Sequence, residues 1–111
     1  MKVAVVGHCA SGKTTVVKLL RADGYDAYSV AQEHSVIRDL WKHQEPQHVL
    51  YLDVSLDELR RRRGNPQWPA WIFEEQESRL LDARRNATVV INTDKHEPED
   101  IVRIWQEKVE G

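Results

Sequence analysis

The feature that most constrains this chain is a short run of small and polar residues, Gly7-His8-Cys9-Ala10-Ser11-Gly12-Lys13-Thr14. This run matches the pattern G-x-x-x-x-G-K-[ST] at every fixed position. The apolar run 3–6 precedes it and predicts a buried parallel strand. Residues 14–22 follow it with the apolar spacing of a helix, which we expect to stop near Gly24. Strand, glycine-containing loop and helix are the order that a phosphate-binding loop (P-loop) requires.

The chemistry of such a loop follows from its backbone. The two glycines allow a tight wrap, so that amide N–H groups converge on one point where they can donate to phosphate oxygens. The first turn of the helix adds free N–H groups and the positive end of its dipole. The pattern assigns Lys13 to the β and γ phosphates of a nucleotide and the Thr14 hydroxyl to Mg²⁺, with Thr15 near the α phosphate. The predicted nucleotide-binding residues in this part of the chain are Gly7, His8, Cys9, Ala10, Ser11, Gly12, Lys13, Thr14 and Thr15.

Length and charge narrow the function further. With 111 residues we expect a single domain, 1–111, with one core. The formal net charge of −2 gives no global basic field, so neither nucleic acid nor a membrane surface is an expected partner. No apolar run approaches the roughly 20 residues of a membrane span. The single cysteine, Cys9, cannot form an internal disulfide, which favours a reducing, cytoplasmic location.

Beyond the loop, strand and helix patterns alternate along the chain. This alternation predicts an α/β fold with three αβα layers and four parallel strands in the order 2-1-3-4. The loop would then lie at the carboxyl ends of the strands, at the switch point of the sheet. The expected elements after residue 24 are a strand at 25–30, a short helix at 36–43 capped by Ser35, a strand at 48–54, a helix from the Ser55-x-x-Glu58 capping box to Arg63 with Gly64 past its end, a loop at 65–69, a helix from 71 or 72 to 85, a strand at 88–92 and a helix that opens at Pro98.

Three segments in this order resemble P-loop kinases: the motif itself, the strand Val49-Leu50-Tyr51-Leu52-Asp53-Val54 with its arginine-rich helix, and the closing Val89-Val90-Ile91-Asn92-Thr93-Asp94 with its Pro-Glu helix. The chain is most similar to the nucleoside-monophosphate-kinase group, which includes adenylate, shikimate and gluconate kinases. The resemblance implies ATP–Mg²⁺ as donor and a small molecule, for example a nucleoside or nucleotide, as acceptor. It implies that Arg61 or Arg62 packs on the adenine, that 64–71 forms a lid and that 92–96 flanks the base. Arg63 and Arg79 would be lid-side arginines that touch phosphates.

The chain also departs from this group. Its members are longer and use the extra residues for an acceptor-binding segment, whereas the corresponding interval 31–47 holds one short predicted helix. A second hypothesis is therefore an ATP-binding regulatory or assembly module with little or no transferase activity. A GTPase switch is disfavoured because no D-x-x-G follows the loop and 92–95 is not N-K-x-D. A kinase acting on nucleic-acid ends is disfavoured by the negative charge.

Acidic residues at strand ends are the remaining catalytic candidates. Glu33 follows the second strand and can accept the proton of an acceptor hydroxyl or hold a Mg²⁺-bound water, with His34 as an orienting neighbour. Asp53 ends the third strand and could act on Mg²⁺ through a water, or serve only as a turn residue. Trp68 and Trp71 in the lid could stack on a base or form a subunit interface. A homodimer could then supply the missing acceptor pocket from the partner copy.

Overall fold

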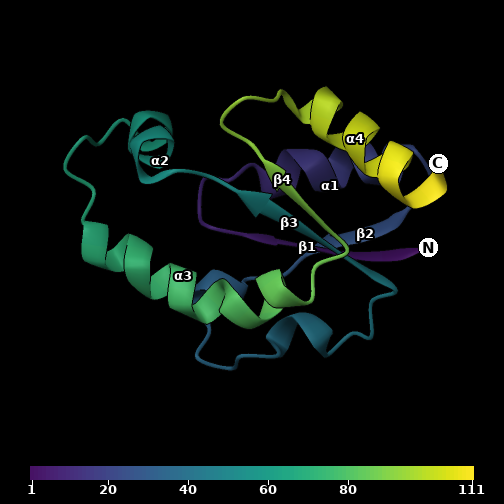
Figure 1. Cartoon of the computed structure of the whole chain (residues 1–111), viewed down its shortest axis with the longest axis horizontal. Coiled ribbons are helices and arrows are strands. Elements are labelled where there is room, and N and C mark those ends of the chain that lie inside the picture. Colours follow the sequence, from purple (N-terminus) through teal and green to yellow (C-terminus); the bar gives the residue numbers. More distant parts are fainter.

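The computed structural model describes residues 1–111 as one four-stranded sheet flanked by helices (Figure 1). All strand pairs are parallel and the order is β2-β1-β3-β4, which confirms the predicted α/β fold and its strand order. In chain order the elements are β1 Lys2–Gly7, α1 Lys13–Ala22, β2 Asp26–Ser29, the 3₁₀ turns η1 Gln32–His34 and η2 Leu40–Lys42, β3 His48–Asp53, α2 Leu56–Arg63, α3 Ala70–Arg85, β4 Val89–Asn92 and α4 Pro98–Glu110.

The helices cover the sheet unequally. In Figure 1, α1 and α4 lie together on one face, whereas α3 and the connection between β2 and β3 lie on the other. Helix α2 stands beyond the end of β3, close to where β1 enters the loop before α1. None of the helices combines the length with the apolar character that a bilayer span would need.

Strands β1 and β3 form the centre of the sheet and are buried on both faces. Because side chains alternate along a strand, each of these strands supplies two cores. The outer strands β2 and β4 are only four residues long, against six for each central strand. On the α1/α4 face lie Val3, Val5, Leu50 and Leu52, and on the α3 face lie Ala4, Val6, Val49 and Tyr51.

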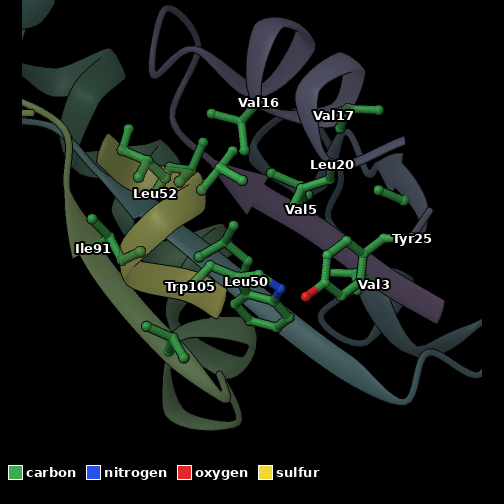
Figure 2. Packing of buried hydrophobic residues seen from close by; sticks show 14 residues of the cluster. Val3, Val5, Val16, Val17, Leu20, Tyr25, Leu50, Leu52, Ile91 and Trp105 are labelled. Atoms are coloured by element: carbon green, nitrogen blue, oxygen red, sulfur yellow. The ribbon is translucent and has the colours of Figure 1, made fainter. Parts of the chain in front are cut away.

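The larger core is built around Trp105 of α4. Its side chain is fully buried, and Figure 2 shows the indole lying against the strands beside Leu50 and Tyr25. The Tyr25 ring meets it edge-on at a centroid distance of 6.4 Å. Helix α1 closes the same core with Val16, Val17 and Leu20 (Figure 2).

The helix predicted at 36–43 is wrong. Within 36–43 the structure has only one short 3₁₀ turn, η2 at Leu40–Lys42, and the physical reason is the buried side chain of Gln32 in the preceding turn, η1. Its amide donates to the Ile37 carbonyl at 2.6 Å and accepts from the Trp41 backbone N–H at 2.9 Å. These bonds satisfy backbone groups that a helix would pair with each other.

Two other helix starts differ in detail from the expectation. The Ser55 hydroxyl caps α2 by accepting from the Glu58 N–H at 3.1 Å, as predicted, but the Glu58 carboxylate does not complete the box and turns to Arg61 and Arg62. Helix α3 begins at Ala70, so the predicted lid, 64–71, ends inside its first turn. Gly64 ends α2 with φ 64°, the left-handed value that favours glycine there.

The fold predicts a loss of stability at alkaline pH. Burial raises the pKa of Tyr51 to about 12, and burial followed by the bond to Glu110 raises the pKa of Tyr25 to about 12. In an unfolded chain these phenols titrate near pH 10. The neutral phenols therefore make their full contribution to the free energy of unfolding below pH 10. This contribution is lost as the pH rises toward 12, and the loss is about 2 kcal/mol for Tyr51. Urea unfolding at pH 8, 10 and 11 measures this loss. Tyr51→Phe should show a smaller loss between pH 10 and 11, and an unchanged loss would contradict the assignment.

Candidate functional site

The predicted phosphate-binding loop forms a tight turn between β1 and α1. Ala10 has φ 61° and Gly12 has φ 95°, both in the left-handed region. The Ser11 N–H donates to the His8 carbonyl at 3.1 Å, which closes the turn. Strand β1 lies between β2 and β3, so the loop opens where chain connections leave on both sides of it. The loop therefore lies at the position where open α/β sheets have their ligand-binding crevice.

The loop presents a row of free amide groups. The backbone N–H groups of Ala10, Gly12, Lys13, Thr14 and Thr15 donate no hydrogen bond within the protein. All five residues line a cavity of about 320 Å³, together with Cys9, Ser11 and Glu33. Several adjacent donors at the beginning of a helix attract an anion through both hydrogen bonds and the helix dipole. We call this cavity the cradle.

Close packing around Gly7 determines the shape of the cradle, and the Ser11 hydroxyl is part of this packing. A Cβ on Gly7 would lie 2.5 Å from the Leu52 carbonyl oxygen and 2.8 Å from the Ser11 Oγ. The Ser11 hydroxyl is buried and has no hydrogen-bond partner. The loop can therefore bend over the end of β3 only because residue 7 has no side chain.

Lys13 and Glu33 form an ion pair at the edge of the cradle. The Lys13 ammonium contacts the Glu33 Oε2 and also donates to the carbonyls of Gly7 at 2.8 Å and His8 at 3.1 Å. The Glu33 side chain is only 3% exposed, and its second oxygen, Oε1, is buried without a partner. A carboxylate oxygen that is buried and unpaired is costly, and such groups are concentrated where a protein acts on a ligand.

The position of Glu33 depends on its neighbours. Gln32, fully buried, donates to the Arg79 carbonyl of α3 at 3.3 Å in addition to its bonds in the β2–β3 connection. The Arg79 guanidinium donates to the Glu33 carbonyl at 3.3 Å and to the Glu75 carboxylate at 2.6 Å. Arg79 thus holds the backbone of η1 rather than pointing into the cradle. His34 is largely exposed, and its Nε2 lies 3.9 Å from the Glu33 Oε2.

His8 has a role that the sequence did not indicate beyond its place in the motif. Its ring is completely buried and stacks on Phe73 of α3 at a centroid distance of 4.1 Å. Nδ1 lies 3.2 Å from the Gln76 Oε1 and Nε2 lies 2.6 Å from the Glu77 Oε1. The Gln76 oxygen also accepts from the Cys9 N–H at 3.4 Å. Helix α3 therefore holds the first half of the loop, and no local pattern signals a contact across such a separation in sequence.

A second, larger cavity adjoins the cradle. It has a volume of about 440 Å³ and shares Ala10, Ser11, Gly12 and Thr15 with the cradle. It extends to the segment 93–98 and to Arg61 and Arg62 of α2. The predicted loop beside the base and the predicted base-packing arginines thus line one cavity. We call it the outer cavity.

The four arginines of α2 have different partners. Arg61 is 73% exposed and donates only to the Glu58 carboxylate, whereas Arg62 also reaches the loop and Thr93. Hydrogen bonds from Arg61 and then from Arg62 lower the pKa of Glu58 to about 2, so that this carboxylate stays ionised at neutral pH. Arg60 binds the Trp68 carbonyl, and the Arg63 guanidinium lies over the Trp68 ring at 3.9 Å. Arg63 therefore packs on the segment 64–71 and does not line either cavity.

Two expectations about Mg²⁺ can be placed in the structure. Thr14 is exposed and lines the cradle. Asp53 forms an ion pair with Arg84 at 3.1 Å and lines neither cavity. No three histidine, cysteine, aspartate or glutamate side chains gather into a cation site. Any Mg²⁺ that binds here would need most of its ligands from phosphate and water, as is usual for this ion at nucleotide sites.

Comparisons of the sequence with protein-family models and with curated proteins gave no match. The sequence matches no protein-family model, and no curated protein shows significant similarity to it.

The two glycines of the loop should respond differently to substitution. Gly7→Ala places a Cβ against a backbone carbonyl that cannot move without breaking the β1–β3 pairing, so we expect a loss of about 3 kcal/mol or more in the free energy of unfolding. A Cβ on Gly12 meets nothing within 4 Å, so Gly12→Ala should cost only the left-handed strain of about 1–2 kcal/mol. Urea unfolding of both variants measures the difference. Equal losses would show that packing against Leu52 is unimportant.

Proposed function

We propose that this chain is an ATP–Mg²⁺-dependent phosphotransferase, a kinase that acts on a small molecule such as a nucleoside or nucleotide. The observation that carries the proposal is the buried carboxylate of Glu33 at the cradle, paired with Lys13 through one oxygen and unpaired at the other. Pure anion binding gains nothing from a carboxylate beside the phosphates, since like charges repel. Phosphoryl transfer does gain from a carboxylate there, because the acceptor hydroxyl must lose a proton and the carboxylate can accept it.

The residues present fit ATP–Mg²⁺. Free amides in the cradle suit a polyphosphate, and the outer cavity, which shares Ala10, Ser11, Gly12 and Thr15 with the cradle, offers an adjoining space for a base and ribose. When bound, ATP–Mg²⁺ would supply the γ-phosphoryl group and neutralise part of its charge. Gly7–Thr15 would hold the phosphates, Thr14 would bind the metal and Arg61 or Arg62 would line the base site.

Each catalytic side chain then has a defined task. Lys13 would exchange the Glu33 oxygen for phosphate oxygens, because its ammonium has three donors and is held by two loop carbonyls in the meantime. Glu33, once released, would accept the proton of the acceptor hydroxyl. Arg63 and Arg79 now contact protein groups, so their proposed contacts with phosphates require the Arg63 guanidinium to leave Trp68 and the Arg79 guanidinium to leave Glu33 and Glu75. A reducing compartment, the cytoplasm, suits the free Cys9 at the cradle.

A binding module without transferase activity is the second candidate. The observation that favours it is the β2–β3 connection, where two 3₁₀ turns occupy the interval that would otherwise carry an acceptor-binding segment. Both candidates require nucleotide binding at the cradle, and they differ only in turnover.

Removal of Lys13 tests the cradle. Lys13→Met alone leaves the buried Glu33 carboxylate without its counter-ion, and we expect a loss of about 3–5 kcal/mol in stability. The double variant Lys13→Met/Glu33→Gln removes both charges and should recover most of that loss. We expect wild type to gain about 2.7 kcal/mol of apparent stability with Mg-ADP at 100 times its Kd, and the double variant to gain none. Lys18→Met on the exposed face of α1 is the matched control. An equal gain in the double variant would contradict a nucleotide site at the cradle.

Glu33→Gln alone separates the kinase from the binding module. The amide keeps the shape of the side chain but cannot take a proton, so we expect ADP formation with the right acceptor to fall by about 10²–10⁴-fold while Mg-ADP binding is retained. A coupled ADP assay over a broad acceptor panel, with Glu74→Gln as a surface control, measures the effect. Tight nucleotide binding with no ADP formation by wild type on any acceptor would favour the binding module.

A further inference from the structure

We propose that Arg62 is a positioning residue for the phosphate-binding loop, which it holds in its binding conformation by gripping the Ala10 carbonyl. The inference rests on the proposed function for its consequence in ligand binding, but its structural part can be tested without any ligand. It differs from the expectation that Arg62 simply packs on a base.

The guanidinium of Arg62 is almost fully engaged by the protein. Nη1 donates to the Ala10 carbonyl at 2.9 Å and to the Thr93 Oγ1 at 3.1 Å. Nη2 donates to the Thr93 carbonyl at 2.8 Å, and Nε donates to the Glu58 Oε1 at 3.0 Å. Because a guanidinium has five N–H groups, these four bonds leave one donor free. Arg62 therefore has no fork to offer to a phosphate, whereas the exposed Arg61 keeps donors available.

The carbonyl that Arg62 holds belongs to the strained residue of the loop. Ala10 has φ 61°, and Glu45 is the only other non-glycine residue with a positive φ. An alanine in this region carries a steric cost that glycine does not, so it stays there only when its surroundings hold it. The charged hydrogen bond from Arg62 is the contact that the Ala10 carbonyl makes.

The grip on Ala10 fixes a whole peptide unit. In a planar trans peptide the C=O of residue 10 and the N–H of residue 11 point in opposite directions. The C=O is held by Arg62, and the N–H of Ser11 donates to the His8 carbonyl at 3.1 Å. The unit is therefore held at both ends. Its orientation sets where the flanking free N–H groups of Ala10 and Gly12 point, and both line the cradle.

The other end of the Arg62 contact is a rigid support. Thr93 is buried, its N–H and hydroxyl donate to the Asp53 carbonyl at 2.7 and 3.0 Å, and its hydroxyl can accept from Arg62 at the same time. The next residue, Asp94, accepts from the Ser55 N–H at the beginning of α2 at 3.0 Å. One guanidinium thus connects the ends of β3 and β4 to the loop, and couples the outer cavity to the cradle.

The test uses a ligand without a base. We expect Arg62→Ala to weaken binding of Mg-tripolyphosphate about 10-fold and of Mg-ADP by a similar factor, and Arg62→Lys to recover only part of this because an ammonium cannot make the fork. Ala10→Gly should restore much of the affinity in Arg62→Ala, since glycine adopts φ near 60° without cost. The same Ala10→Gly change should give no recovery in Arg61→Ala.

Isothermal titration calorimetry measures all of these affinities. Unchanged tripolyphosphate affinity in Arg62→Ala with weakened ADP, or no rescue by Ala10→Gly, would overturn the proposal.

A second measurement distinguishes failure of this inference from failure of the proposed function. The amide–α-proton coupling of Ala10, measured by NMR without ligand, should move away from its left-handed value in Arg62→Ala and in the milder Arg62→Lys. If wild type binds no polyphosphate or nucleotide, the proposed function fails, and the coupling still decides the role of Arg62. An Ala10 coupling that is the same in wild type and in both variants would overturn it.

Discussion

The contact between the backbone of Gly7 and the carbonyl of Leu52 is the constraint on which the candidate site depends. Strands β1 and β3 pair as far as these two residues, and the chain then turns over the end of β3 with no room for a side chain. The turn leaves the amides at the beginning of α1 without partners inside the protein. The same close approach therefore buries the ends of the two central strands and leaves a set of hydrogen-bond donors open to a ligand. The stability of the fold and the capacity to bind an anion are thus linked at one residue, Gly7.

The loop is held from two sides by parts of the chain that are distant in sequence. Helix α3 holds its first half through the buried ring of His8 and through Gln76, and α2 holds its second half through Arg62. Neither helix joins the larger core cluster, which the sheet forms with α1 and α4, but α3 supplies Leu80 and Ala83 to the core on its own face of the sheet. A ligand that moved either helix would therefore change the loop directly.

Much of this architecture was predictable, because its signals are local. The motif, the apolar runs and the turn residues gave the α/β class, the strand order and the place of the loop. The place of Glu33 beside the loop was also predicted, since parallel strands bring their carboxyl ends together, but its ion pair with Lys13 was not. The helix predicted at 36–43 failed because a single buried amide, Gln32, replaced its backbone pairing. The stacking of His8 on Phe73 and the grip of Arg62 on Ala10 were beyond local reasoning, since they depend on where α2 and α3 come to rest in three dimensions.

The unequal strand lengths have a consequence outside the site. A parallel sheet with open sides offers unpaired backbone groups to any extended chain nearby, which is a route to aggregation. Here the outer strands β2 and β4 have four residues each and flank central strands of six. An incoming segment would find only a short template on either side. The chain thereby keeps its long apolar strands in the middle of the sheet, where they cannot recruit one another between molecules.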